Sequence, residues 1–172
     1  MKKIIYWFLN PAIDGNSSIL IIRMMTGFVF FFEGILKFVY ANQGVGRFTK
    51  LGFPFPEMTA HFVAVFEIVG GLLLLLGLFT RIVAFCFIIE MIVAILSTKI
   101  SLYLGTSPLP LPPALPKVGI WAVEHESRSD FAQILTSLFL VVAGAGRLSF
   151  DFILRRNKKI YHYHEIAALH EA

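Results

Sequence analysis

The sequence contains a single cysteine, Cys86, which excludes both an intramolecular disulfide and a Cys-x-x-Cys dithiol. Charged residues are also scarce, at 15% of the 172 residues, against about a quarter in a typical soluble domain. Apolar residues make up 57% of the chain, and its mean hydropathy is +0.76. Lipid must therefore cover most of the surface, and any redox chemistry would need a bound cofactor or a partner.

The missing charges leave four apolar blocks that are each about as long as a helix that crosses a bilayer. These blocks cover residues 18–38, 59–79, 82–98 and 131–146. They predict an all-α fold, an integral membrane four-helix bundle with antiparallel helices, as a single domain over residues 18–151. Residues 1–17 are expected to form an interfacial segment, with Tyr6 and Trp7 at the level of the lipid headgroups.

The connections and the basic residues predict the orientation of the bundle. Residues 77–81 form so short a link that the second and third blocks should pair as a hairpin, whereas the loop 99–130 holds five prolines between residues 107 and 116. Eight Lys and Arg flank the terminal side and six flank the other, which favours cytoplasmic termini and an outer Pro-rich loop.

The tail over residues 152–172 is basic and is expected to lie in the cytoplasm. Its cations follow the last apolar block, a position typical of contact with anionic lipid rather than with nucleic acid. The tail histidines are too widely spaced to predict a metal site; they are His162, His164 and His170.

Charged side chains inside the apolar blocks need partners or a polar cavity, because an ion in hydrocarbon costs at least a few kcal/mol. Glu33 and Lys37 stand four residues apart in the order that favours an ion pair along a helix, and Glu67 should lie at a similar depth. This cluster has two interpretations: the charges neutralise one another and lock the bundle, or one carboxylate serves a ligand. His61 is a further ligand-binding candidate.

Other charges within and beside the blocks are assigned differently. Glu90 has no evident mate in sequence, so it is either neutral or paired with Arg23. We expect the charges near the inner boundary to be structural, with Asp151 pairing one of the arginines; the group comprises Arg23, Arg81, Arg147 and Asp151.

A polar run precedes the last block, where the Pro-rich loop should return to the membrane. Asp130 or Ser129 is expected to cap the helix that follows. Capping does not account for the whole run, so we also consider it as an outer lid over the charged cluster; the lid candidates are His125, Glu126, Arg128 and Asp130.

The pattern resembles the DoxX family of small four-helix membrane proteins. The most specific segment is FEIVGGLLLLLGLFTR, and GAGRLSFD at the close of the last block supports it. The resemblance implies a bundle in the plasma (bacterial inner) membrane, often associated with quinone-linked oxidoreductases and similar to membrane subunits of thiosulfate:quinone oxidoreductase. A class that resembles vitamin K epoxide reductase uses cysteine pairs, which this sequence lacks.

The resemblance and the charged cluster together suggest a membrane subunit that binds a quinone near Glu33, Lys37 and Glu67. No intrinsic cofactor is expected, so a soluble or membrane oxidoreductase partner would supply the electrons. Two alternatives stay open at this point. One is a non-catalytic scaffold or assembly factor, and the other is a pathway for protons or a small solute.

Overall fold

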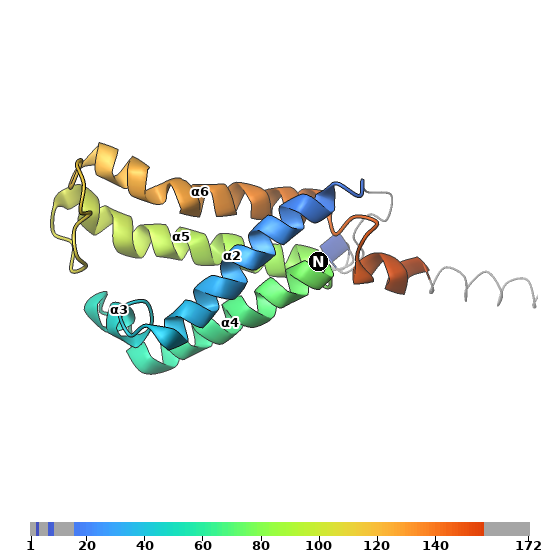
Figure 1. Ribbon diagram of the computed structural model, residues 1–172, viewed down its shortest axis with the longest axis horizontal. Coiled ribbons are helices and arrows are strands. Elements are labelled where there is room, and N and C mark those ends of the chain that lie inside the picture. The colour runs from blue at the N-terminus through green and yellow to red at the C-terminus, as the bar shows by residue number, and fades with distance from the viewer. Residues whose placement is uncertain (1–2, 4–6, 9–15, 157–172) are drawn as a thin grey trace, which may run out of the picture.

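The computed structural model describes Lys3, Trp7, Phe8 and residues 16–156, and every regular element in this part of the chain is helical. Four long helices alternate in direction, and one short helix links the first two (Figure 1). The prediction of an all-α chain is therefore confirmed for the described residues. The helices are α2 (Ile19–Val39), the short α3 (Val45–Lys50), α4 (Pro56–Leu76), α5 (Thr80–Leu104) and α6 (Ile120–Ala143).

Helices α2 and α4 pack closely because small residues bring their backbones together. A Cβ placed on Gly71 would lie 2.7 Å from the carbonyl oxygen of Gly27, and one on Gly34 would lie 2.7 Å from that of Ala64. A side chain at either position would force the two backbones apart. Glycine therefore fixes the line along which this pair of helices meets.

Helices α5 and α6 form the second close pair, and contacts between the two pairs are fewer. The pairs meet at the hairpin end, which carries residues 77–79 and 144–149, and diverge toward the loop end, which carries α3 and residues 105–119 (Figure 1). The fully buried rings of Phe30 and Phe87 stack between the pairs with centroids 3.6 Å apart. The apolar core thus lies where the pairs converge.

The hairpin end is held together by Arg23, which is only 2% exposed. Its guanidinium donates hydrogen bonds to the carbonyl oxygens of Ala145 at 2.6 Å, Leu148 at 2.6 Å and Leu75 at 3.3 Å. Gly77 adopts a left-handed φ of 70°, and a Cβ there would lie 2.5 Å from Arg23 Nη1. Arg23 therefore ties α2 to the end of α4 and to the segment after α6.

Asp151 caps helix α5 from across the hairpin end. Its two carboxylate oxygens accept hydrogen bonds from the backbone N–H groups of Phe79 at 3.0 Å and Thr80 at 3.1 Å. Within the described residues Asp151 makes no ion pair, so the expected pairing with an arginine is wrong. The backbone donors already occupy both of its oxygens, while Arg23 is used by carbonyl groups.

Arg81 is buried at the same end and serves as a second tie. It donates hydrogen bonds to the carbonyl oxygens of Trp7 at 2.8 Å and Val142 at 3.1 Å, and its guanidinium lies 3.9 Å from the centroid of the Trp7 ring. Arg147, by contrast, is exposed. The expected structural group thus divides into three residues with defined contacts and one at the surface.

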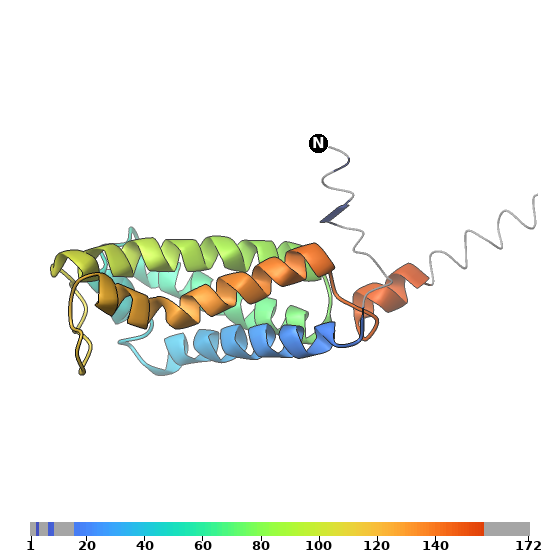
Figure 2. The same cartoon turned by 90° about the horizontal axis from the view of Figure 1, so that it is seen from above.

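Several predictions concern residues outside the described part of the chain. They include the interfacial placement of Tyr6, most of the basic tail, and the three tail histidines His162, His164 and His170. Trp7 and a helical segment over residues 150–156 are described, and both lie at the hairpin end (Figure 2).

The helix bounds correct the expected extent of the Pro-rich loop. Helix α5 continues to Leu104 and α6 begins at Ile120, so the loop covers residues 105–119 rather than 99–130. Gly105 and Gly119 flank it with positive φ angles of 70° and 85°. Hydropathy misplaced this boundary because the polar residues that open α6 are fully compatible with a helix even though they are not apolar.

Three of the described helices, α2, α4 and α5, are long and apolar enough to cross a membrane. Helix α6 is as long, at 24 residues, but it is of mixed polarity. Its first half carries the charged residues Glu124, Glu126, Arg128 and Asp130, and its second half is uncharged and mainly apolar apart from Gln133, Thr136 and Ser137.

Candidate ligand-binding cavity

A cavity of about 730 Å³ lies where the two helix pairs diverge. Phe30 lines its floor and separates it from the core, and residues of the α3 segment such as Phe48 and Leu51 also line it. The volume falls within the range of about 300–1,000 Å³ that is usual for ligand pockets. Its charged lining comprises five acids and three bases: Glu33, Glu67, Glu90, Glu126, Asp130, Lys37, Arg47 and Lys99.

The centre of the charged lining is an ion pair between α2 and α4. Lys37 Nζ lies 2.5 Å from Glu67 Oε2, and the two side chains are 14% and 3% exposed. The predicted approach of Lys37 to Glu67 is therefore confirmed, whereas Glu33 makes no ion pair among the described residues. An unpaired carboxylate costs more free energy at the buried position of Glu67 than at Glu33, which is exposed at the edge of the cavity.

Glu90 of α5 approaches the same ion pair from the opposite helix pair. Its carboxyl group lies within hydrogen-bonding reach of Glu67, so it is not paired with Arg23. Oε2 of Glu90 is buried and finds no donor among the described residues unless the two carboxyl groups share a proton. The site thus places two carboxyl groups beside one lysine, with Glu90 in the position that the sequence suggested for Glu33.

Gln133 of α6 completes the polar end of the cavity. Its side chain is 5% exposed, and its Oε1 atom is buried without a hydrogen-bond partner in the described part of the protein. A buried amide oxygen without a donor costs roughly 1–3 kcal/mol. Gln133 therefore offers a ligand a hydrogen-bonding position that no neighbouring side chain fills.

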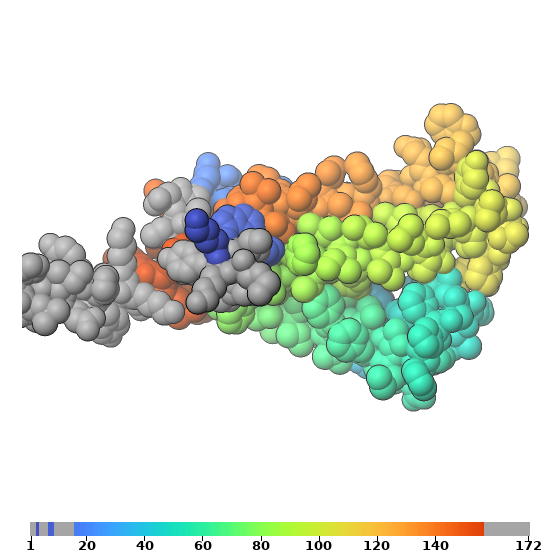
Figure 3. Space-filling model, turned by 180° about the vertical axis from the view of Figure 1, so that it is seen from behind, coloured from blue at the N-terminus to red at the C-terminus, as the bar shows by residue number. Residues whose placement is uncertain are grey.

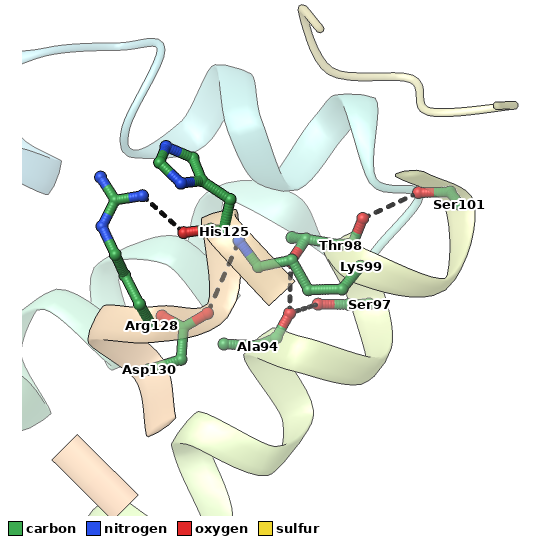
Figure 4. Close-up of polar contacts among 8 residues, drawn as sticks. All are labelled: Ala94, Ser97, Thr98, Lys99, Ser101, His125, Arg128 and Asp130. Atoms are coloured by element: carbon green, nitrogen blue, oxygen red, sulfur yellow. Dashed lines mark hydrogen bonds and ion pairs between the residues drawn. The ribbon is translucent and has the colours of Figure 1, made fainter. Parts of the chain in front are cut away.

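A second ion pair lies nearer the loop end, between α5 and α6 (Figure 4). Lys99 Nζ lies 3.5 Å from Asp130 Oδ2, with side-chain exposures of 13% and 22%. Asp130 sits in the middle of α6, so the expectation that it caps this helix is wrong. The cap fails because the helix begins ten residues earlier, at Ile120, with Gly119 as its N-cap.

The four lid candidates divide between the cavity and the surface. Glu126 and Asp130 line the cavity, whereas His125 and Arg128 are exposed and do not. Arg128 donates a hydrogen bond of 2.6 Å to the backbone oxygen of His125, and both side chains point away from Lys99 (Figure 4). All four residues lie on a regular helix rather than on a loop.

His61, the remaining ligand-binding candidate, lies away from the cavity. It is exposed on α4, and its ring stacks on Phe38 with centroids 5.4 Å apart. The other predicted ligand-binding residues, Lys37 and Glu67, do line the cavity. The binding roles proposed for Glu33, Lys37 and Glu67 stay predictions, now with a shared cavity around them.

Comparison with known proteins agrees with this arrangement. The family model described as DoxX matches residues 18–100. The chain is also 40% identical over 144 residues to "Uncharacterized membrane protein Rv3486" of Mycobacterium tuberculosis (strain H37Rv), with 80% of this chain and 82% of that protein aligned. The chain belongs to the DoxX family. It is accordingly a membrane protein, as its apolar helices indicate.

A more distant relative carries a name that refers to an activity. The chain is 29% identical over 140 residues to the Bacillus subtilis (strain 168) protein named "Putative oxidoreductase CatD", with 81% of this chain and 89% of that protein aligned. No solved structure matches the chain at a significant level. The cavity of this DoxX protein therefore has to be interpreted from its own geometry.

Two residues of the cavity had weak or no signals in the sequence. Glu90 was recognisable as an unpaired charge in an apolar block, but nothing local showed that it faces Glu67. Gln133 was one polar residue among several in its block. Only the convergence of α4, α5 and α6 gives these two side chains a common site.

Proposed function

We propose that this DoxX-family protein binds a small redox-active lipid such as a quinone in the cavity and acts as a membrane subunit of a quinone-linked oxidoreductase system. The observation that carries the proposal is a mainly apolar cavity of about 730 Å³ whose lining includes buried polar groups from α4 and α6, Glu67 and Gln133. The name of the Bacillus relative supports the oxidoreductase part of the proposal.

The lining fits such a molecule on two counts. A planar ring can lie among apolar and aromatic side chains such as Phe30, Phe62 and Phe66. A quinone oxygen can accept a hydrogen bond from the Lys37 ammonium, and the hydroxyl group of the reduced quinol can donate one to the unfilled Gln133 Oε1 atom. A quinone would supply two-electron redox chemistry, and its electrons would come from a partner enzyme.

The residues of this chain would bind the ring and handle protons. Lys37 can donate a hydrogen bond to a ring oxygen while it stays paired with Glu67. Glu67 and Glu90 can hold a proton between them and exchange it with that oxygen. The exposed carboxylate of Glu33 at the edge of the cavity gives the pair a route toward water.

We further propose that α6 is a fourth crossing and that the protein resides in the plasma membrane with both termini in the cytoplasm. The last apolar stretch of α6 runs to the hairpin end, where Arg23 and Arg81 lie. The excess of basic residues on the terminal side favours this orientation. The loop end, and the cavity near it, would then face the outer side.

Retention of quinone tests the proposal. Purified protein is incorporated into lipid nanodiscs that contain a long-chain ubiquinone, re-isolated, and its bound quinone is quantified by mass spectrometry. Because a hydrogen bond to a charged group contributes about 1.5–3 kcal/mol, Lys37→Met and Glu67→Gln should each lower retention about tenfold or more. Lys50→Met, at an exposed position on α3, is the matched control and should retain quinone normally. Unchanged retention in both cavity variants would rule the site out.

A non-catalytic scaffold is the alternative of a different class. A scaffold whose buried charges only set the helix register needs a bundle that is packed tightly around Glu67. The cavity beside Glu67 and the unfilled hydrogen-bonding position at Gln133 favour a ligand-binding site instead. The nanodisc experiment separates the two, because a scaffold would retain no quinone in any form of the protein.

A pathway for protons or solutes across the whole bundle has less support. Such a pathway requires polar side chains at successive depths, and Gln133 and Ser137 do stand one turn apart on α6 with buried oxygens that lack partners among the described residues. At the hairpin end, however, Arg23 donates to three carbonyl groups and is wedged against Gly77. The Asp151 carboxylate at this end is likewise engaged, since both of its oxygens accept hydrogen bonds from backbone N–H groups.

A further inference from the structure

The cavity has two lateral mouths of opposite character, because the two helix pairs leave one gap between α4 and α5 and another between α2 and α6. A residue that both lines the cavity and is exposed on the outside marks a mouth. Figure 3 shows the molecule from behind, where it widens from the hairpin end toward the loop end. The gap between α4 and α5 and the gap between α2 and α6 both widen toward the loop end.

The mouth between α4 and α5 is apolar. Phe62 of α4 and Ile89 and Val93 of α5 line the cavity and are 69%, 48% and 45% exposed. All three lie on helices that are apolar enough to span a membrane. Hydrocarbon from the surrounding lipid can therefore enter this mouth without displacing water from polar groups.

The mouth between α2 and α6 is polar and acidic. Glu33 of α2 and Ser129 of α6 both line the cavity and are exposed, and Asp130 lies beside them. Val29 of α2 is an exposed apolar residue on this side. It lies on the face of α2 opposite Gly27 and Gly34, which pack against α4. A hydrocarbon chain passing here would lie against the carboxyl groups of Glu33 and Asp130, and an ionised group in contact with hydrocarbon costs several kcal/mol.

The charge of the cavity selects the head that accompanies such a chain. Its lining holds five carboxyl groups and three basic side chains, and two of the bases, Lys37 and Lys99, are already paired with acids. Arg47 is the one lining base without an ion pair among the described residues, so an anionic head would meet a single available cation among five carboxyl groups. The lining therefore favours an uncharged head with polar oxygens over an anionic head such as a fatty-acid carboxylate.

We infer that the cavity takes its ligand directly from the bilayer through the α4/α5 mouth, and that the ligand is a single-chain amphiphile with an uncharged polar head. The tail lies between Phe62 and Val93 and extends into the lipid, while the head reaches the Lys37–Glu67 pair and Gln133. The inference rests on the proposed binding function, but its route can be tested independently of quinone.

Cys86 provides the reporter, because it is the only cysteine in the chain and it lines the cavity. The full-length protein in nanodiscs is treated with a dodecyl maleimide or with a sulfonated maleimide, and alkylation is followed by intact mass spectrometry. An ionised group in hydrocarbon costs about 2.5–3.5 kcal/mol, so the tailed reagent should react about a hundredfold faster than the sulfonated one.

Two matched substitutions identify the mouth that is used. Val93→Trp narrows the α4/α5 mouth, and Val29→Trp adds the same bulk at the α2/α6 mouth. Because overpacking costs about 1–3 kcal/mol, Val93→Trp should slow labelling by the tailed reagent about tenfold, while Val29→Trp leaves the rate unchanged. N-ethylmaleimide, which is small and uncharged, should still label Cys86 in both variants and so excludes misfolding or direct shielding.

The outcomes separate the route from the function. Equal labelling by the tailed and sulfonated reagents, or a larger effect of Val29→Trp than of Val93→Trp, would overturn the inferred route even if quinone is retained. Tail-selective labelling that depends on Val93, in a protein that retains no quinone, would keep the route and reject the quinone. In that case the ligand is another neutral amphiphile.

Discussion

The hairpin end and the cavity half of this bundle use buried charge in opposite ways. At the hairpin end, Arg23 directs its donors to three backbone carbonyls while Gly77 makes room for its guanidinium. In the cavity half, Lys37, Glu67 and Glu90 gather beside empty volume, and Gln133 is left with an unfilled acceptor. The first arrangement is complete in itself, whereas the second has room and hydrogen-bonding capacity for another molecule.

The difference shows how to distinguish structural from functional charge in a membrane bundle. Both regions hold ionisable side chains that are at most a few per cent exposed, such as Arg23 and Glu67. Burial alone therefore does not identify the site. Completed hydrogen bonds and close packing indicate a structural role, and surplus carboxyl groups beside a cavity indicate a binding role.

The largest expected effect comes from breaking the hairpin end with Arg23→Met. The substitution keeps a similar length but leaves three carbonyl groups without their donor, so it should lower the free energy of unfolding by about 3–5 kcal/mol. Thermal unfolding in detergent micelles measures the loss, and Arg23→Lys, which keeps the charge but not the fork of donors, should fall between Met and the unmodified protein. A stability loss below that of the Gly71 variant described next would contradict a central structural role for Arg23.

A smaller effect is expected when bulk is added to each half in turn. Gly71→Ala puts a methyl group 2.7 Å from backbone atoms of α2, so it should destabilise the protein by about 1–3 kcal/mol. Ala94→Leu adds more atoms, but it adds them beside the cavity and should leave stability nearly unchanged while it lowers quinone retention. Thermal unfolding and retention measured on both variants test the comparison. If Ala94→Leu proves as destabilising as Gly71→Ala, the added side chain meets no empty volume, and the cavity is closed in the protein in solution.

The smallest effect is expected at the partly exposed ion pair near the loop end. Lys99→Gln removes the 3.5 Å contact with Asp130, and because both side chains are hydrated the cost should be below about 1 kcal/mol. The double variant Lys99→Gln, Asp130→Asn serves as the control, since a pair of little value should give nearly additive changes in unfolding midpoint. A coupling well above that figure would show that the pair closes the loop end more firmly than its exposure indicates.

Much of the fold was predictable because helix length and apolarity are local properties. The blocks at 18–38 and 59–79 lie within a few residues of α2 and α4, and the short link at 77–81 does reverse the chain. The expected pairing of the second and third blocks is wrong, because α4 packs mainly on α2 and α5 mainly on α6. The last block was placed to begin at residue 131, eleven residues after the observed start of α6 at Ile120, since Glu124 to Asp130 are hydrophilic yet helical. Hydropathy reports membrane preference, whereas a polar stretch that lacks glycine and proline can be helical as readily as an apolar one.

The candidate site was predictable only in part. The sequence identified Glu33, Lys37 and Glu67 as charges that need an explanation, and all three line one cavity. It placed Lys37 near both Glu33 and Glu67 without deciding between them, because spacing along one helix is visible in a sequence, whereas the acid that Lys37 pairs with stands thirty residues away on α4. It also left Glu90 without a neighbour for the same reason.

The sequence by itself determined that the chain is helical, that it is a membrane protein, and that a few charged side chains must be buried inside it. Each of these follows from the composition of consecutive residues and from the cost of placing ions in hydrocarbon. The tertiary structure decided which acid Lys37 meets, where the lid candidates lie, and that a cavity exists at all. These features depend on how two helix pairs, each locked by its own close packing, diverge from their shared end. The angle between the two helix pairs depends on contacts between segments that are distant in the sequence, so no local sequence pattern encodes it.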